Sequence, residues 1–199
     1  LNSPCNPTGA VMTRAEMDAI ADVLKRHRAY VLSDEIYEYM RFDGREHVSA
    51  AQYPWLLDRT IVVNGVSKSY AMTGWRIGYC AAPQDVADAI SKVQSQMTSS
   101  ACSVSQKAAL AGIKGGLAYP NKMVVDFKRR RDICFEELKD IPGVHLDQPE
   151  GAFYAFPHIP SMLTGSVDGK PLKDSTGFTH YLLDKYHVAV VPGSAFRAP

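Results

Sequence analysis

The sequence has little of several features that mark particular protein classes. Its 199 residues contain no run of about 18 apolar residues, the length that a membrane-spanning helix needs, and no secretion-type leader at the start. Lysine and arginine number 22 against 21 aspartates and glutamates, so the formal net charge is only +1. Because so weak a field attracts neither nucleic acid nor an anionic membrane surface, the sequence predicts a cytoplasmic protein that binds neither.

Cysteine is scarce as well. The four cysteines, Cys5, Cys80, Cys102 and Cys134, are widely separated, without the paired spacing of a metal site or the density of a disulfide scaffold. We therefore expect four free thiols and no metal site. With 46% hydrophobic residues, the chain can bury the core of one large or two small globular domains.

Both ends of the sequence resemble cuts. The chain starts at Leu1 rather than at a methionine, inside the turn-rich stretch "LNSPCNPTG", and it stops in "VVPGSAFRAP", which we interpret as a loop. These features predict a piece of a longer chain, truncated at both ends.

The first part of the chain alternates helical and strand-like patterns. Thr13 and Glu16 have the spacing of a capping box ahead of apolar residues at helical intervals, which predicts a helix over about 13–28. A second helix is predicted over about 84–98. Short β-prone segments without strict alternation are predicted as strands buried on both faces: residues 30–35, 59–65 and 76–82. Strands interleaved with helices predict an α/β fold with a mostly parallel sheet.

The pattern changes after the glycine-bearing stretch 112–120. A long charged helix is predicted from residue 121, followed by the strand-like but turn-interrupted stretch 144–159, a helix over about 175–186 and the strand "HVAVV" at 187–191. This is an α+β pattern. We therefore predict two domains, residues 1–117 and 118–199.

Two charged residues stand where an α/β sheet binds ligands, at the carboxyl ends of strands, and a third follows the second of them. Asp34 closes one predicted strand, Lys68 follows another, and Arg76 comes eight residues later. Taken singly, Lys68 is more often a solvated charge and Asp34 a helix cap. Together, an amine that can form a Schiff base and a guanidinium suited to phosphate indicate an aldehyde cofactor with a phosphate group. That cofactor is pyridoxal phosphate, whose ring nitrogen a carboxylate such as Asp34 keeps protonated.

The motifs "NPTG" (6–9), "SDEIY" (33–37) and "GVSKSYAMTGWRIG" (65–78) resemble, in order and spacing, the class I/II aminotransferases. These are fold-type I pyridoxal-phosphate enzymes of the aspartate aminotransferase type. The resemblance covers essentially the whole chain, including "EGAFYAF" and "VVPGSAF". It implies that residues 1–117 are the central part of the large cofactor-binding domain and residues 118–199 an incomplete small domain.

The resemblance also implies a role for each matching residue. Lys68 corresponds to the Schiff-base lysine, which, once displaced by the substrate, moves a proton between the substrate's Cα and the cofactor's C4′ carbon. Asp34 corresponds to the partner of the ring nitrogen, and Arg76 to the phosphate ligand. Tyr37 and Asn6 correspond to donors to the ring's phenolic oxygen, although singly they are more often a packing residue and a turn former.

One position departs from the pattern of the family. Many relatives have a phosphate-binding serine three residues before the lysine, where this chain has Gly65, and Ser67 is a candidate replacement. Gly74 and Gly78 are expected to permit close backbone approach or unusual backbone angles.

The predicted function is transfer of an amino group from an amino acid to a 2-oxo acid, with aspartate and 2-oxoglutarate as the best-matching pair. The family implies a homodimer. Two alternatives are a carbon–sulfur lyase, which characteristically has His-Asn-Pro where this chain has Cys5-Asn6-Pro7, and a ligand-sensing domain of a transcription regulator. Relatives also have an N-terminal phosphate turn and, beyond Pro199, an arginine for the substrate carboxylate, so we expect the 199-residue chain alone to have low activity.

Overall fold

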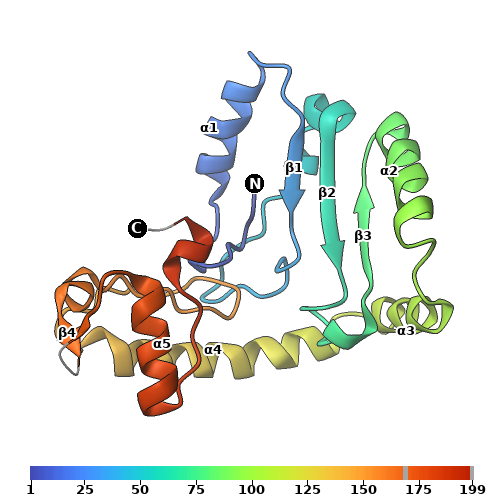
Figure 1. Cartoon of the computed structure of the whole chain (residues 1–199). Coiled ribbons are helices and arrows are strands. Elements are labelled where there is room, and N and C mark those ends of the chain that lie inside the picture. The colour runs from blue at the N-terminus through green and yellow to red at the C-terminus, as the bar shows by residue number, and fades with distance from the viewer. Residues whose placement is uncertain (168–169, 198–199) are drawn as a thin grey trace. The chain divides into compact units, whose positions relative to one another are not determined.

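The computed structural model describes residues 1–167 and 170–197, which form two compact units (Figure 1). Unit 1 comprises Leu1–Asp132 and Pro149–Tyr154, and unit 2 comprises Ile133–Gln148 and Ala155–Pro199. The division falls inside one continuous helix, α4 (Ala118–Lys139), which begins where the sequence pattern changes. The assignment of a cofactor-binding domain and a small domain stays a prediction.

Unit 1 contains a three-stranded sheet in the order β1 (Val31–Asp34), β2 (Thr60–Gly65), β3 (Gly78–Ala81). β1 and β2 are parallel, with Asp34 opposite Val63, whereas β3 pairs antiparallel with β2. The predicted α/β class is confirmed, although one of the two strand pairs in this sheet is antiparallel, where the sequence predicts a mostly parallel sheet. Because β1 and β2 run in the same direction, their carboxyl ends lie side by side, and the segments that follow them emerge from the same edge of the sheet.

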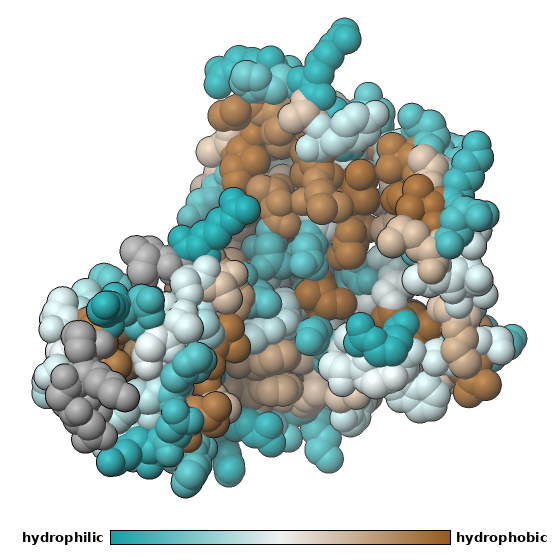
Figure 2. Space-filling view, viewed as in Figure 1, coloured by the Kyte–Doolittle hydropathy of each residue, from teal (hydrophilic) through white to brown (hydrophobic). Residues whose placement is uncertain are grey.

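The prediction that these strands are buried on both faces is wrong for the residues that the structure describes. Leu32 of β1 is 56% exposed, and all four residues of β3 are exposed. Figure 2 shows hydrophobic residues at the surface over the region where Figure 1 draws β1 and β2. The apolar composition of a strand indicates that its side chains can be buried. In these strands, the described residues bury only part of that apolar surface.

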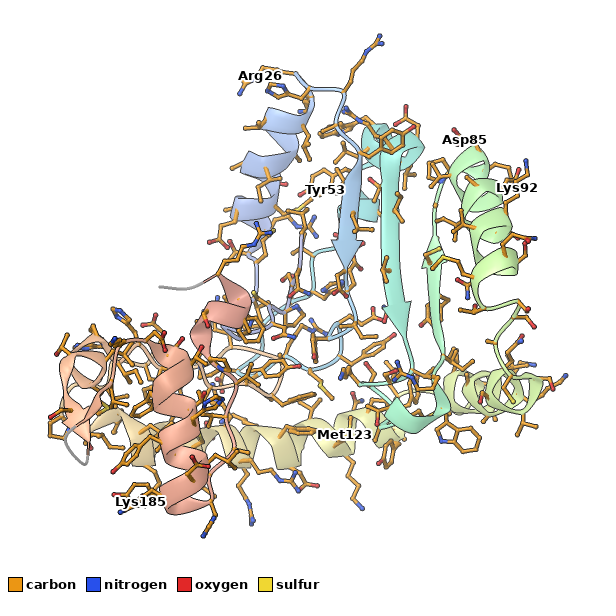
Figure 3. The ribbon with its side chains drawn as sticks, viewed as in Figure 1. Arg26, Tyr53, Asp85, Lys92, Met123 and Lys185 are labelled. Atoms are coloured by element: carbon orange, nitrogen blue, oxygen red, sulfur yellow. The ribbon has the colours of Figure 1, made fainter. Side chains whose placement is uncertain are left out.

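Helix α1 (Arg14–Leu24) has the predicted capping box, with Thr13 and Glu16 each bonding the other's backbone N–H. It ends four residues before the predicted limit. Its buried residues Met17 and Ala21 belong to a hydrophobic cluster that also contains Val31, Val48, Ala50 and Leu56. Tyr53, labelled in Figure 3, packs against this cluster. The loop between β1 and β2 thus folds back over α1 and β1.

Two further helices, α2 (Gln84–Met97) and α3 (Ser103–Lys114), precede α4. The sequence predicts α2 and the long helix, but it does not predict α3, whose small residues give only a weak apolar pattern. The core position Ala109 of α3 packs with Val66 and Ile77. In the described part of the chain, no helix combines the length and apolar composition needed to cross a membrane.

Unit 2 has little regular structure besides helix. Its elements are the end of α4, the short pair β4 (Ser166–Val167) and β5 (Lys170–Pro171), helix α5 (Ser175–Tyr186), and the 3-10 turns Pro160–Thr164 and Gly193–Phe196. Helix α5 matches its prediction, with Asp174 as N-cap. The strand predicted at 187–191 is wrong. His187 ends α5 in the left-handed conformation, and the β-branched residues after it pair with no strand among the described residues.

Candidate active site

The residues singled out from the sequence all lie in unit 1. Asp34 is the last residue of β1, Tyr37 lies in the turn after it, and Lys68 comes three residues after the end of β2. Asn6 lies in the N-terminal turn, and Arg76 ends the 3-10 turn Thr73–Trp75 just before β3. The adjacent carboxyl ends of β1 and β2 therefore carry the carboxylate, the phenol and the amine.

Lys68 is half-buried among aromatic rings. Its Nζ lies 6.0 Å from the ring centroid of Tyr37 and 5.5 Å from that of Phe153. Cation–π attraction at these distances favours a charged amine over the ring faces. The structure thus brings Lys68 and Tyr37 together, as the sequence predicts, and adds Phe153, which the sequence analysis had given no role.

Tyr37 is almost completely buried and shares a hydrogen bond between hydroxyl groups with Tyr154. Burial, the hydrogen bond with Tyr154 and the nearby negative charge of Asp34 all raise the pKa of Tyr37 above its ordinary value. The phenol therefore keeps its proton at neutral pH and can serve as a donor.

Asp34 is fixed by its own turn and by the N-terminal segment. Its Oδ1 accepts a hydrogen bond of 3.2 Å from the N–H of Ile36, and its backbone N–H donates to the carbonyl of Leu1 at 2.9 Å. One carboxylate oxygen is thus committed to orienting the side chain. No hydrogen bond to the other oxygen is recorded among the described residues.

Asn2 connects the turn of Asn6 to the end of β1. Its side-chain Nδ2 donates to the carbonyl of Asp34 at 3.2 Å, and its Oδ1 accepts from the backbone N–H of Asn6 at 2.7 Å. One side chain thereby sets the position of two predicted site residues. Sequence reasoning missed Asn2, although asparagine in a turn-rich segment commonly bonds to nearby backbone groups, and that habit could have identified it.

Beneath the turn lies a buried polar network centred on Glu35. Its Oε1 accepts hydrogen bonds from Ser33 at 2.9 Å and Ser49 at 2.7 Å, and its Oε2 is 2.8 Å from Nε2 of His47. Burial by itself raises the pKa of Glu35, but the hydrogen bonds from His47, Ser49 and Ser33 outweigh it, so the pKa lies below its ordinary value. Glu35 is therefore a buried carboxylate that anchors the segment between Asp34 and Tyr37.

Arg76 differs from the other candidates because it is exposed. It adopts a left-handed conformation (φ 56°), and its guanidinium donates to the carbonyl of Thr73 within the same turn at 2.9 Å. Within residues 1–167 and 170–197, no hydrogen bond or ion pair joins Arg76 to Asn6, Asp34, Tyr37 or Lys68. The structure places it next to β3 but does not bring it into contact with the rest of the predicted site.

The close backbone approach expected at Gly74 and Gly78 occurs at Gly65 instead. A Cβ at Gly65 would lie 2.9 Å from the carbonyl oxygen of Ile77 and 3.1 Å from Cα of Gly78, whereas Gly74 has open space around it. A Cβ at Gly78 meets only an ordinary contact. β2 thus packs so tightly against the segment that leads into β3 that a side chain at position 65, such as the serine of many relatives, would require a shift of the backbone.

The four cysteines are free, as predicted. Among the residues that the structure describes, no group of three or more His, Cys, Asp or Glu side chains could hold a metal ion.

A family model described as aminotransferase class I and II matches residues 1–199. Among curated proteins, the chain is 46% identical over 203 residues to a bifunctional aspartate aminotransferase and glutamate/aspartate-prephenate aminotransferase from Petunia hybrida, covering 98% of this chain and 42% of that protein. It is 46% identical over 200 residues to an aspartate aminotransferase from Rhizobium meliloti strain 1021, covering 98% and 48%.

Solved structures give the same result. The crystal structure of the aspartate aminotransferase from Rhizobium meliloti matches with a TM-score of 0.93 and 44% identity over 100% of this chain and 50% of that one. The aromatic aminotransferase from Pyrococcus horikoshii OT3 matches with a TM-score of 0.85 and 38% identity, covering 99% and 51%. The chain therefore spans about half the length of the relatives it matches.

Proposed function

Since the chain belongs to the class I and II aminotransferase family, we propose that it forms the lysine-bearing part of a pyridoxal-phosphate-dependent aminotransferase. The observation that carries this proposal is the position of Lys68 at the joint carboxyl ends of β1 and β2, with its Nζ over the rings of Tyr37 and Phe153. The curated relatives named above are all called aminotransferases, which favours transamination over the lyase and regulator alternatives.

The groups around Lys68 fit this cofactor chemically. An amine can bind an aldehyde, a buried phenol that keeps its proton can donate to the phenolic oxygen, and a strand-end carboxylate can hold the proton of a ring nitrogen. We assign these roles to Lys68, Tyr37 and Asp34. Asn6 is the second donor to the phenolic oxygen, and its exposed side chain leaves its amide accessible to a ligand.

Arg76 is assigned to the phosphate. A guanidinium is always charged and presents a planar set of donors that matches phosphate oxygens. Because Arg76 is exposed and its side chain donates to the carbonyl of Thr73 within its own turn, it can turn toward a phosphate without breaking a tertiary contact.

When bound, the cofactor supplies an electron sink that stabilises negative charge developing at the Cα of the amino acid. The amine of Lys68, once free, would be the base that takes the proton from Cα and delivers it to the cofactor's C4′ carbon. Asp34, through its charge, keeps the sink protonated and electron-poor.

The decisive experiment is reductive trapping. The chain is mixed with pyridoxal phosphate and reduced with borohydride, and the modified lysine is located by peptide mass spectrometry. We expect selective modification of Lys68 and its loss in Lys68→Ala. Lys92→Ala is the matched control, because Lys92 is an exposed lysine on α2 (Figure 3). Modification spread over surface lysines and unchanged in Lys68→Ala would contradict the proposal.

For the substrate, we propose aspartate as amino donor and 2-oxoglutarate as acceptor. The relatives from Petunia hybrida and Rhizobium meliloti both carry aspartate aminotransferase in their names, which supports this choice. The test follows the absorbance of the bound cofactor after addition of one of three amino acids. These are aspartate, phenylalanine and the amino acid that forms when prephenate accepts an amino group. We expect the fastest conversion with aspartate, and faster conversion with phenylalanine would indicate an aromatic substrate instead.

A homodimer and a cytoplasmic location are part of the same proposal. Sedimentation of the purified chain tests the first and fractionation of cells the second. Low activity of the 199-residue chain by itself is also proposed, and turnover comparable with that of full-length relatives would contradict it.

A further inference from the structure

Tyr154 lies beside the proposed site and has no part in the function described above. It belongs to the segment Pro149–Tyr154 of unit 1 and is half-buried. Its ring meets that of Tyr37 edge to face, with centroids 5.7 Å apart and an interplanar angle of 82°. The neighbouring Phe153 contacts Tyr37 in the same way at 5.5 Å and 81°. Two consecutive aromatic rings thus fix the ring plane of Tyr37.

The backbone that carries Tyr154 is held on both sides. The N–H of Gly151 donates to the carbonyl of Gly9 at 2.8 Å, and the N–H of Ala152 donates to the carbonyl of Met40 at 2.8 Å. Ala152 is completely buried and has a positive φ of 57°, a conformation that residues other than glycine adopt only where the surroundings enforce it. Tyr154 is therefore presented to Tyr37 from a rigid support.

The hydrogen bond between the two phenols limits where their protons can point. Each hydroxyl has one proton and can both donate and accept. If Tyr37 gives its proton to the cofactor's phenolic oxygen, it can only accept from Tyr154, so Tyr154 must donate to Tyr37. A hydroxyl that accepts a hydrogen bond becomes a stronger donor itself, because bonds in a chain polarise one another.

We infer that Tyr154 is a positioning residue, whose hydroxyl orients the proton of Tyr37 toward the cofactor's phenolic oxygen. The inference rests on the proposed function, since it assigns a role toward the same ligand. It differs from a packing role in depending on the hydroxyl of Tyr154 and not on its ring. Burial, the largest cause of the raised pKa of Tyr37, keeps the phenol protonated, as a donor to the cofactor requires.

The test compares Tyr37→Phe, Tyr154→Phe and the double variant, with Tyr119→Phe as matched control. Tyr119 is an exposed tyrosine of α4 in the same unit. Phenylalanine keeps the ring and removes only the hydroxyl. Each protein is loaded with pyridoxal phosphate, and the pH midpoint of the bound cofactor's visible absorbance change is measured. This readout requires no turnover.

We expect Tyr37→Phe to raise the midpoint by about one pH unit, because an anionic oxygen that loses a donor holds nearby protons more tightly. Tyr154→Phe should raise it by about 0.3 unit, since neighbouring hydrogen bonds strengthen one another by roughly 10–30%. The double variant should match Tyr37→Phe alone, because Tyr154 acts through Tyr37. Tyr119→Phe should leave the midpoint unchanged.

Two results would overturn the inference while leaving the proposed function intact. One is an unchanged midpoint in Tyr154→Phe, and the other is a further shift when Tyr154→Phe is added to Tyr37→Phe, which would mean an independent effect. If the unaltered chain gives no cofactor band and no trapped Lys68, the proposed function fails, and the inference fails with it.

Discussion

The two segments that bear the proposed site are held in very different ways. The segment Ser33–Tyr37, at the end of β1, is fixed by a buried carboxylate with three side-chain donors and by a buried phenol pair. Apart from the buried Ser69, the segment Lys68–Arg76, after β2, is half-buried to exposed, with Ala71 and Arg76 in the left-handed conformation. The first segment is therefore organised by the chain itself, whereas the second has charged groups left available to a ligand.

The comparison predicts where mutations act. Changes in the first segment should lower the free energy of unfolding, because they break contacts present without any ligand. Changes of charged groups in the second should lower cofactor affinity and leave unfolding nearly unaffected.

The largest effect is expected for Glu35→Ala. It leaves the donors of Ser33, His47 and Ser49 without their buried acceptor, and breaking such a network costs about 3 kcal/mol of unfolding free energy. Urea unfolding of the cofactor-free chain at neutral pH measures it, with the exposed Glu46→Ala as control. A loss no greater than that of the control would mean that the first segment is not organised by its buried network.

The next effect is expected at Gly65, the last residue of β2, just before the second segment. In Gly65→Ala the new Cβ would lie 2.9 Å from the carbonyl oxygen of Ile77, so either β2 or the segment that leads into β3 must move. We expect this movement to lower the free energy of unfolding by about 2 kcal/mol. Gly74→Ala, where nothing lies within 4 Å, is the matched control and should change stability by less than about 0.5 kcal/mol. Equal unfolding midpoints for the two variants would contradict the tight approach of β2 to β3.

A smaller effect is expected for Arg76→Ala, and it concerns cofactor affinity instead of the free energy of unfolding. An exposed charge pair contributes about 1 kcal/mol, so pyridoxal phosphate should bind roughly fivefold more weakly. Unfolding of the cofactor-free chain should stay within about 0.5 kcal/mol of the original. Fluorescence titration with the cofactor gives the affinity. Unchanged affinity would remove Arg76 from the proposed phosphate site.

The smallest effect concerns pH. The pKa of Glu35 is lowered from 4.5 in the folded chain, so its ionised form stabilises the fold above that pH. This stabilisation is lost as the pH falls through the lowered folded pKa, because the proton then binds to both states. In urea unfolding between pH 7 and pH 3, the difference between the original chain and Glu35→Gln should therefore shrink toward the acid end. A difference that grows on acidification would have the wrong sign.

Much of the site was predictable from local sequence. The signature around Lys68 and the strand-end position of Asp34 singled out the proposed amine and carboxylate, and the structure places Lys68 over the ring of Tyr37. The position of Arg76 in an exposed turn, apart from these residues, was not predictable, because side-chain reach and backbone handedness are not visible in the spacing of a motif.

The predictions that failed have a common cause. The run "HVAVV" and the strands β1 and β3 are apolar enough to be buried, yet 187–191 forms no strand and β3 is exposed. A sequence pattern states what a segment can bury. Whether a partner lies against it depends on other segments.

The sequence by itself determined the features that depend on residues a few positions apart. These are the capping box of Thr13 and Glu16 and the helices α2, α4 and α5, together with the motif from which Lys68 is proposed as the reactive amine. Only the tertiary structure decided that Tyr154 meets Tyr37 across 117 residues, and that His47 and Ser49 complete the network of Glu35. The physical reason is the separation along the chain over which each interaction acts. Helix periodicity and capping act within one or two turns of chain, whereas a buried hydroxyl or carboxylate takes its partners from whichever segments the folded chain brings to it.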